Sequence, residues 1–294
     1  MTDRSLNGGR TRAPRSNPRL GEHGVVMMDT LFLLTGGAVE YRQQSADDLM
    51  GSLEANSVQM VLTDPPYGVS YQSNRSIQKR KPISNDWNFQ IGPFLQAAER
   101  ILKEGGVCYL FTRWDIYPLW VRNLPPGLAL KNFIVWNKDN HSSGDLTGNF
   151  GFKWEGIMML VKGRHVLRGS RWSNVWDFPR VPFKQQRHPA EKPVALLRRA
   201  IEASSDPGDL VVDPFAGSGA TGEAALLTGR NALLGDIDAD YVRKGRERLG
   251  LTVEDLPAPT ITRVVETDPT VCLDALEGLH PEEIRSVAEY LRNR

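Results

Sequence analysis

The sequence predicts an α/β fold built on one sheet, and three patterns in its 294 residues support this. Over residues 27–250, short apolar runs alternate with amphipathic helical patterns, as in sheets whose strands are joined by helices. One apolar run, residues 58–62, stops at an Asp-Pro-Pro-Tyr corner, and another, residues 210–213, leads through a glycine-rich loop into a helical pattern. We therefore expect one large domain over residues 27–250.

The elements of this domain follow from helical spacing, apolar runs and breaker residues. Residues 93–103 (PFLQAAERILK) carry apolar side chains at helical spacing, and Gly105-Gly106 is the expected stop. Pro193 stands at the expected first position of a helix that runs to residue 203, and a further helical run covers 223–227. Strands are expected at residues 58–62, 107–111, 133–136, 157–161, 210–213 and 231–235.

The two ends of the chain and its composition exclude several protein classes. Residues 1–26 predict a flexible basic tail, and residues 251–294 predict a linker and a C-terminal helix to which no function is assigned. The sequence has neither a signal-peptide pattern nor an apolar run near the roughly 18 residues of a membrane helix, so we expect a cytoplasmic protein without membrane contact. The two cysteines and five histidines show no disulfide or metal-ligand spacing, and no metal is expected.

Residues 63–68 (TDPPYG) form the corner at the end of the first expected strand. Neither Pro65 nor Pro66 can donate a ladder hydrogen bond, and each restricts the residue before it, so the strand must end there. Ligand crevices of open α/β sheets lie at the carboxyl ends of strands, where a rigid corner could hold a functional group in place. The alternative is a simple strand-terminating turn.

A second motif follows the strand at residues 210–213. Gly217, Gly219 and Gly222 spell GxGxxG between this strand and a helical run, and such glycines let the backbone approach a ligand closely in front of a helix N-terminus. The next expected strand delivers Asp236, whose carboxylate can accept hydrogen bonds from two ribose hydroxyls. The pattern predicts a nucleoside-cofactor pocket, with a structural glycine turn as the alternative.

The surrounding residues narrow the choice of cofactor. Glu223 stands where a Walker A loop needs Lys, which argues against a nucleoside-triphosphatase. Too few residues follow Gly222 for the usual second half of a dinucleotide fold, although an NAD enzyme stays open. The carboxylate of Asp213 would repel a pyrophosphate but attract a cation. S-adenosylmethionine, which brings a sulfonium and an ammonium and no phosphate, fits this pattern.

Three motifs together resemble the β class of the DNA amino-methyltransferases, over about residues 27–250. They are Asp64-Pro-Pro-Tyr67, His188-Pro-Ala-Glu-Lys-Pro193 and Asp213-Pro-Phe-Ala-Gly-Ser-Gly219, in the order of that class. The resemblance implies a Rossmann-like, seven-stranded and circularly permuted methyltransferase fold with a small target-recognition insertion. It also implies S-adenosylmethionine as methyl donor and a flipped DNA base as acceptor. The implied catalytic residues are Asp64, Pro65, Pro66 and Tyr67, and the implied cofactor-binding residues are Lys192, Pro193, Asp213, Phe215, Gly217, Ser218, Gly219, Thr221 and Asp236.

The corner has a chemical role in this class. The lone pair of an exocyclic amine is delocalised into the base, so the amine is a poor nucleophile. If Asp64 and the Pro65 carbonyl each accept one N–H, the lone pair is localised and oriented, and positive charge growing on nitrogen is stabilised. Tyr67 would stack on the base, which must first leave the duplex. Asp in the first motif position favours adenine N6 as the target, and cytosine N4 stays open.

Target recognition is expected between residues 139 and 187. From Lys153 to Arg187 eight basic residues face two acids, and Trp172, Trp176 and Phe178 are interleaved with them, as suits phosphate contacts and base stacking. The alternative is a solvated basic loop whose tryptophans lie in the core. A second candidate is residues 74–81, which could close over a flipped base. The expected DNA-binding residues are Arg75, Lys79, Arg80, Arg164, Arg168, Arg171, Lys184 and Arg187.

Several alternatives remain at this stage. Cys108 lies in an apolar strand and no Pro-Cys pair occurs, so cytosine C5 methylation is not expected and Cys108 is assigned to the core. An NAD-dependent oxidoreductase would leave residues 64–67 unexplained, and a non-catalytic DNA-binding relative would show no methyl transfer. In the related RNA amino-methyltransferases the cofactor loop normally precedes the catalytic tetrapeptide, so RNA is a weaker alternative as substrate. The expected partner is double-stranded DNA, and a homodimer and a companion restriction endonuclease are left open.

Overall fold

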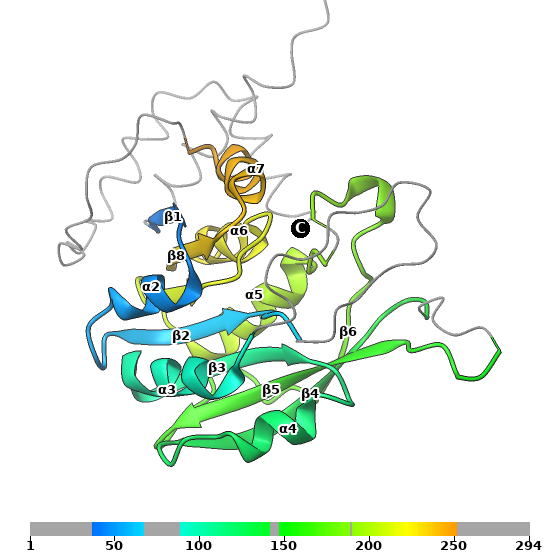
Figure 1. Cartoon of the computed structure of the whole chain (residues 1–294), viewed down its shortest axis with the longest axis horizontal. Coiled ribbons are helices and arrows are strands. Elements are labelled where there is room, and N and C mark those ends of the chain that lie inside the picture. The colour runs from blue at the N-terminus through cyan, green and yellow to red at the C-terminus, as the bar shows by residue number, and fades with distance from the viewer. Residues whose placement is uncertain (1–36, 68–88, 142–146, 189, 252–294) are drawn as a thin grey trace, which may run out of the picture.

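The computed structural model describes residues 37–67, 89–141, 147–188 and 190–251, and these form a twisted sheet covered by helices on both faces (Figure 1). The sheet of this described part has eight strands in the order β1-β8-β7-β2-β3-β5-β4-β6. The strands are β1 Val39–Gln43, β2 Val58–Thr63, β3 Leu102–Thr112, β4 Leu128–Asn137, β5 Trp154–Lys162, β6 Val175–Asp177, β7 Leu210–Asp213 and β8 Asn231–Asp236. The helices are α2 Ala46–Gly51, α3 Ile91–Ile101, α4 Tyr117–Arg122, the 3-10 turn η2 Phe183–Gln185, α5 Val194–Ser204, α6 Ala220–Leu226 and α7 Ala239–Leu249.

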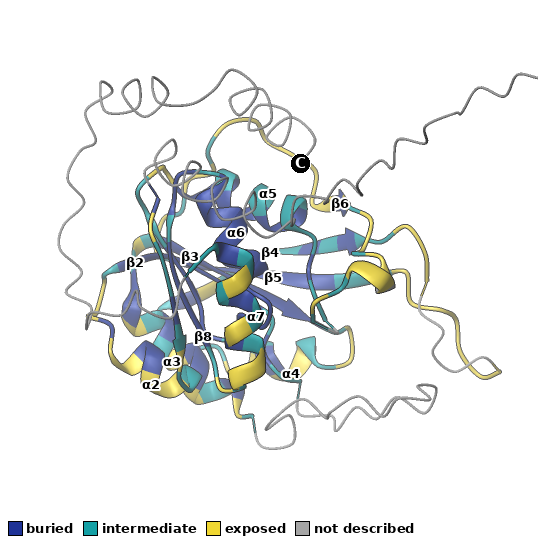
Figure 2. Ribbon diagram, turned by 90° about the horizontal axis from the view of Figure 1, so that it is seen from above, coloured by how far each residue is buried: buried dark blue, intermediate teal, exposed yellow. Residues whose placement is uncertain are grey.

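Two apolar cores lie on the two faces of the sheet, because successive strand side chains point to opposite sides. In β3, Tyr109 and Phe111 pack with α5, α6 and α7, whereas Cys108 and Leu110 pack with α2, α3 and α4. Figure 2 shows the resulting pattern, with buried strands between helices whose outer sides are exposed. Cys108 is fully buried in the second core, as the sequence predicted.

The predicted α/β class and most element positions are confirmed. The sheet has one strand more than the expected seven, because the three residues of β6, which lie inside the predicted target-recognition region, pair with β4 and form the outermost strand. Gly105-Gly106 does not end a helix as predicted, since α3 already ends at Ile101 and both glycines lie in β3. A Cβ on Gly106 would come within 2.8 Å of the Lys103 carbonyl oxygen, so this irregular part of the strand requires glycine.

The order of the strands gives the sheet two functionally different edges. β1, β8, β7, β2 and β3 are all parallel, so their carboxyl ends share one edge, here called the carboxyl edge. β5 is antiparallel to β3 and starts at this edge, so that Lys162 and the residues after it lie at the opposite, amino edge. The chain forms β2 before β7, its neighbour in the sheet, which is the permuted order that the motifs predicted.

Several sequence predictions concern residues outside the described ranges. They are the basic tail, residues 74–81 with Arg75, Lys79 and Arg80, and the C-terminal linker and helix. Among the helices that the structure does describe, none combines the length and apolarity needed to cross a membrane.

Candidate active site

A cavity of about 780 Å³ opens at the carboxyl edge, between the corner that follows β2 and the loop that follows β7. The register of β2 and β7 explains why the corner and the loop face each other. Val61 pairs with Val212, so the two parallel strands end at the same level of the sheet. Eleven of the thirteen predicted catalytic and cofactor residues line it: Asp64, Pro65, Pro66, Tyr67, Lys192, Asp213, Phe215, Gly217, Ser218, Thr221 and Asp236. Pro193 and Gly219 instead form the N-caps of α5 and α6.

The Asp64 carboxylate is held from both sides. Its Oδ1 accepts a hydrogen bond from the Tyr67 hydroxyl at 2.5 Å, and its Oδ2 lies 2.6 Å from the Lys192 ammonium. Burial raises the pKa of Tyr67 well above its usual value, and Asp64 and Glu155 raise it further, so the phenol stays a donor. The Tyr67 ring packs against Trp120, with centroids 5.9 Å apart, and its stacking on a base stays a prediction.

Lys192 lies in a chain of alternating charges. Its ammonium binds Asp64 and, at 3.0 Å, Glu155 of β5, whose second oxygen binds Lys138 after β4. Burial would lower the pKa of Lys192, but attraction to Asp64 and Glu155 outweighs it and raises that pKa above its ordinary value. For Glu155, burial opposes ionisation, but Lys192 and Lys138 outweigh it and lower its pKa to about 2. Lys192 and Glu155 therefore form an ion pair near neutral pH.

The glycine loop has the geometry that its sequence predicted. Gly217 and Gly219 have φ values of +53° and +78°, in the left-handed region that favours glycine. A Cβ on Gly219 would lie 3.2 Å from the Cα of Gly245 in α7, so this glycine allows two segments to approach. A Cβ on Gly222 would come within 2.7 Å of the Leu234 side chain, so the third glycine is needed for helix–sheet packing.

Asp213 organises the loop from within. Its oxygens accept hydrogen bonds from the Thr63 hydroxyl at 2.6 Å, the Thr221 hydroxyl at 2.6 Å and the Phe215 N–H at 3.1 Å. Burial raises the pKa of Asp213 to about 6, although these hydrogen bonds act in the opposite direction. The carboxylate that the sequence assigned to attracting a cation therefore also joins the two motifs, through Thr63 at the end of β2.

Asp236 holds the same loop from the next strand. Its Oδ2 accepts the Gly217 N–H at 3.0 Å and its Oδ1 accepts the Asp238 N–H at 2.9 Å. The Tyr41 hydroxyl of β1 donates to the Gly217 carbonyl at 2.6 Å. Burial raises the pKa of Asp236, and the carboxylate still lines the cavity. It is therefore placed where a ribose could reach it.

The segment before α5 closes the cavity beside the glycine loop. The His188 ring stands edge-on to Tyr241 of α7, with centroids 4.3 Å apart, and burial lowers the pKa of His188 to about 4. Glu191 pairs with Arg248 of α7 at 2.8 Å, and Arg248 also binds Glu223 of α6 at 2.5 Å. These buried ion pairs fix the segment, the loop and α7 relative to one another.

The residues around the glycine loop fit a positively charged nucleoside better than a phosphate ligand. Asp213 and Asp236 bring carboxylates to the cavity wall, and Phe215 packs edge-on against Phe89, which also lines the cavity, at 5.4 Å. Lys192 also lines the cavity, but its ammonium is already paired with Asp64 and Glu155 and so is not free to bind a phosphate. No group of three or more potential metal ligands occurs within the described ranges.

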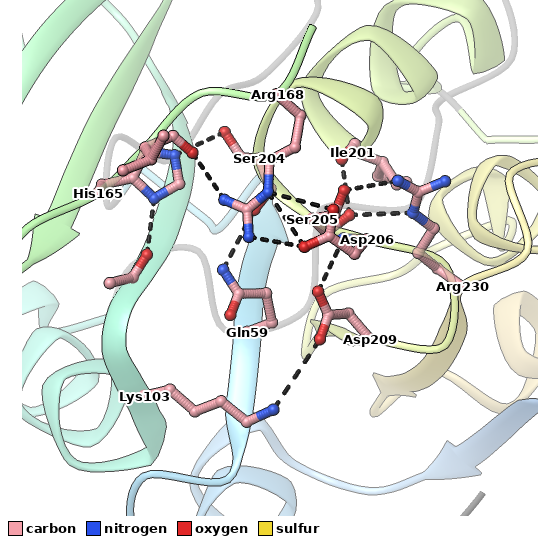
Figure 3. A network of polar contacts seen from close by, with 12 residues as sticks. Gln59, Lys103, His165, Arg168, Ile201, Ser204, Ser205, Asp206, Asp209 and Arg230 are labelled. Atoms are coloured by element: carbon pink, nitrogen blue, oxygen red, sulfur yellow. Dashed lines mark hydrogen bonds and ion pairs between the residues drawn. The ribbon is translucent and has the colours of Figure 1, made fainter. Parts of the chain in front are cut away.

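The structure brings some of the predicted DNA-binding residues to the cavity side and not others. Lys184 and Arg187 are exposed in the segment that leads to His188, beside the cavity. Arg164 and Arg168 follow β5 and lie at the amino edge, where Arg168 binds Asp206 at 2.9 Å (Figure 3). Arg171 is exposed between the two edges, in the connection that leads from β5 to β6.

The interleaved aromatic residues also divide. Trp176 is 5% exposed and packs on Tyr109 in the core, so its assignment to the DNA surface is wrong, because β6 is a strand of the sheet. Trp172 is 41% exposed, and its ring centroid lies 4.6 Å from Cζ of Arg199. The same guanidinium also lies over the ring of Phe178, which is partly buried. The alternative of tryptophans in the core is thus confirmed for Trp176.

Other residues at the carboxyl edge were missed by the sequence reasoning. Glu155, a charged residue just before the apolar run of β5, was the available signal for the lysine network. Near the end of β3, Arg113 lines the cavity, and the next residue, Trp114, stacks on Phe152 with centroids 6.1 Å apart. Phe150 is 92% exposed in the segment before β5. An aromatic surface therefore begins next to the cavity, formed by Trp114, Phe150 and Phe152.

Comparisons with known proteins agree with this site. A family model described as DNA methylase matches residues 58–247, which include all three motifs. The DNA adenine methyltransferase YhdJ of Escherichia coli is 32% identical, over 67% of this chain and 78% of its own length. The type II methyltransferase M.HpaI of Haemophilus parainfluenzae is 30% identical, over 67% of this chain and 70% of its own.

Solved structures show a similar fold. The M1.HpyAVI–SAM complex aligns with a TM-score of 0.55 at 20% identity, covering 71% of this chain and 99% of that one. The cytosine-N4-specific PvuII DNA methyltransferase aligns with a TM-score of 0.58 at 15% identity, covering 87% of this chain and 93% of that one. These likenesses confirm the Rossmann-like methyltransferase fold.

Proposed function

Because the chain belongs to the N6/N4 DNA methylase family, we propose that it transfers a methyl group from S-adenosylmethionine to adenine N6 in double-stranded DNA. The observation that carries this proposal is the position of Asp64. A carboxylate fixed by Tyr67 and Lys192 faces the same cavity as a glycine loop between two further carboxylates.

The corner activates the acceptor amine. Asp64 and the Pro65 carbonyl accept its two N–H groups and localise the lone pair on nitrogen. Such orientation contributes several kcal/mol when reacting atoms are held roughly 3 Å apart. Asp64 stays available for this bond, because a carboxylate has about four lone-pair sites, and Tyr67 and Lys192 each use one. Its negative charge stabilises the positive charge that grows on nitrogen.

The cofactor would be held by the residues around the glycine loop. Asp236 would accept the ribose hydroxyls, Phe215 would pack on the adenine ring, and Gly217 and Ser218 would approach it with their backbone. Asp213 and Thr221 keep the loop in its shape through their hydrogen bond. Bound S-adenosylmethionine supplies the methyl group of a sulfonium as the electrophile.

Adenine N6 is favoured over cytosine N4 by two observations. The first motif position is Asp64 in this chain, and YhdJ, 32% identical to it, is a DNA adenine methyltransferase. The cytosine-N4-specific PvuII enzyme is similar in fold at 15% identity, so methylcytosine is the competing outcome of the test below.

The duplex would lie across the carboxyl edge. An extruded base leaves a gap in the stack, and apolar or aromatic side chains are suited to fill such gaps. The aromatic surface of Trp114, Phe150 and Phe152 is exposed next to the cavity-lining Arg113, and Lys184 and Arg187 are exposed near its other side. This arrangement favours Lys184 and Arg187 over Arg164 and Arg168 as phosphate contacts.

The test is methyl transfer by the purified full chain. Duplex DNA is incubated with S-adenosylmethionine carrying a labelled methyl group, digested to nucleosides and analysed by mass spectrometry. The expected product is N6-methyladenine, whereas N4-methylcytosine would overturn the assignment of the base. Asp64→Asn should lose about 100- to 1000-fold in kcat while DNA affinity is retained. Absence of labelled methyl groups from DNA treated with the folded, unaltered enzyme contradicts the proposed function. An equal kcat for the unaltered enzyme and folded Asp64→Asn contradicts the role of Asp64.

A further inference from the structure

Glu155 has a position that no motif accounts for. It is the second residue of β5, and the side chains from residue 157 to residue 161 of this strand are buried and apolar. Both of its oxygens are engaged at the cavity, one by Lys138 and the other by Lys192 at 3.0 Å. Its side chain is 26% exposed at the cavity wall, so the two lysines partner a carboxylate that is only partly removed from water.

The Lys192 ammonium is enclosed, so that these two carboxylates are its main partners. Its side chain is 10% exposed, and its ammonium lies 4.8 Å from the Phe111 ring centroid and 5.8 Å from that of Trp136. Aromatic walls restrict access of water, so the ammonium is held by Asp64 on one side and by Glu155 on the other. The lysine connects the carboxylate of β5 with the carboxylate of the catalytic corner.

We propose that Glu155 is a positioning residue that shares Lys192 with Asp64, and thereby keeps the Asp64 carboxylate aligned for the acceptor amine. This inference rests on the proposed methyl transfer and names a residue outside its three motifs. Glu155 itself need not touch the substrate, because it acts through the lysine.

The physical reason is the division of one positive charge between two acids. An ammonium paired with Asp64 alone would neutralise most of the negative potential that the amine experiences. With Glu155 at 3.0 Å on its other side, the positive charge of the ammonium is shared between two carboxylates, while its contact of 2.6 Å still fixes the Oδ2 atom of Asp64. Lys138 balances Glu155, so that Lys138, Glu155, Lys192 and Asp64 alternate in sign and sum to zero.

A pH effect distinguishes this role from mere packing. The charged and titratable groups around Lys192 are Asp64 after β2, Glu155 on β5, Lys138 after β4, His188 in its own segment, and Tyr67 and Arg113 in the cavity wall. Glu155 is one of the two attractions that raise the pKa of Lys192, so removing its charge lowers that pKa. The alkaline limb of the kcat profile should then move to lower pH.

The experiment compares Glu155→Gln and Glu155→Asp with the unaltered enzyme. The matched control is Glu202→Gln, which removes an exposed i,i+4 pair with Arg198 on α5. Glu155→Gln should lower kcat about 10- to 100-fold, since a displacement of about 1 Å can cost about 100-fold. KM for DNA and cofactor should change little, the alkaline limb should move to lower pH, and Glu155→Asp should restore part of kcat.

The outcomes separate this inference from the proposed function. If the unaltered enzyme methylates DNA and Glu155→Gln has the same kcat and pH profile, Glu155 does not position Asp64. If kcat falls but the pH profile is unchanged and Glu155→Asp restores nothing, the role is structural and the inference is also overturned. If the unaltered, folded enzyme transfers no methyl group, the proposed function itself fails. Thermal melting of each variant confirms that folded proteins are compared.

Discussion

Polar side chains gather at both edges of the sheet, but they are organised differently. At the carboxyl edge they surround a cavity of about 780 Å³, and Asp64 and Asp236 both line it. At the amino edge they bind one another, as Figure 3 shows, and the hydroxyl of Ser204 lies 2.7 Å from that of Tyr109 and 3.0 Å from Nε2 of His165. The first arrangement leaves lone pairs facing a space where a ligand fits, whereas the second uses them within the protein.

This contrast shows that a count of charges along the sequence does not by itself define one surface. Arg168 and Lys184 contribute equally to a basic segment, yet one pairs with Asp206 at the amino edge and the other is exposed near the cavity. The chain of β5 runs from one edge to the other between Glu155 and Arg164. Basic residues on either side of this strand therefore belong to different surfaces.

The largest effect is expected for Arg248→Met, which tests whether the carboxyl edge also depends on internal pairing. Arg248 binds Glu191 and Glu223, and all three side chains are at most 6% exposed. Loss of the guanidinium leaves buried carboxylates without their cation, so the free energy of unfolding should fall by about 3–5 kcal/mol. Urea denaturation measures this. A decrease below 1 kcal/mol would show that the segment before α5, the glycine loop and α7 are held together by other contacts.

A smaller effect is expected for Ser204→Ala at the amino edge. Ser204 is fully buried, and its hydroxyl lies between Tyr109 and His165, so the substitution leaves both without this partner. The free energy of unfolding should fall by about 1–3 kcal/mol, while kcat for methyl transfer is unchanged in the folded protein. A selective loss of kcat would break the division into a structural and a functional edge. Asp64→Asn is the matching variant at the cavity, where kcat should be lost.

The pH dependence of stability sharpens the comparison through Asp213. Burial raises its pKa to about 6 in the folded protein, above the ordinary value near 3.8 of the unfolded chain. The folded protein therefore binds more protons between these two values, and the contribution of Asp213 to stability falls as the pH rises through this window. Between pH 4 and pH 6.5 the free energy of unfolding, measured by denaturation, should decline less for Asp213→Asn than for the unaltered protein. An equal decline in both proteins assigns the effect to other groups.

The smallest effect is expected for Arg168→Glu. Its partner Asp206 is 62% exposed, and exposed pairs contribute about 0.2–1 kcal/mol, so stability should fall by about 1 kcal/mol or less. DNA affinity should be unchanged, because Arg168 lies at the edge opposite the cavity. The matched variant Lys184→Glu should weaken DNA binding and reduce its salt dependence. Equal loss of DNA affinity in both variants, measured by fluorescence anisotropy, places DNA on the amino edge as well.

The local motifs were predictable because the backbone conformation of each one depends on residues that are adjacent in sequence. Pro65 and Pro66 end a strand wherever it lies, and Gly217, Gly219 and Gly222 mark a loop between strand and helix. The strand boundaries were less accurate where tertiary packing decided them. Gly105 and Gly106 read as the end of a helix but lie within β3, because Gly106 packs against the backbone of Gln59 in β2.

By itself, the sequence determined the fold class and the two strand-end motifs, since apolar periodicity and breaker residues act over a few neighbouring positions. The permuted order followed from the family resemblance that the motifs carry. The tertiary structure decided which charges belong together. Glu155 reaches Lys192, 37 residues away, only because β5 runs antiparallel to β3 and begins at the carboxyl edge. The same reversal carries Arg164 and Arg168 to the other edge. Pairing of strands distant in sequence places these side chains, and no local pattern encodes it.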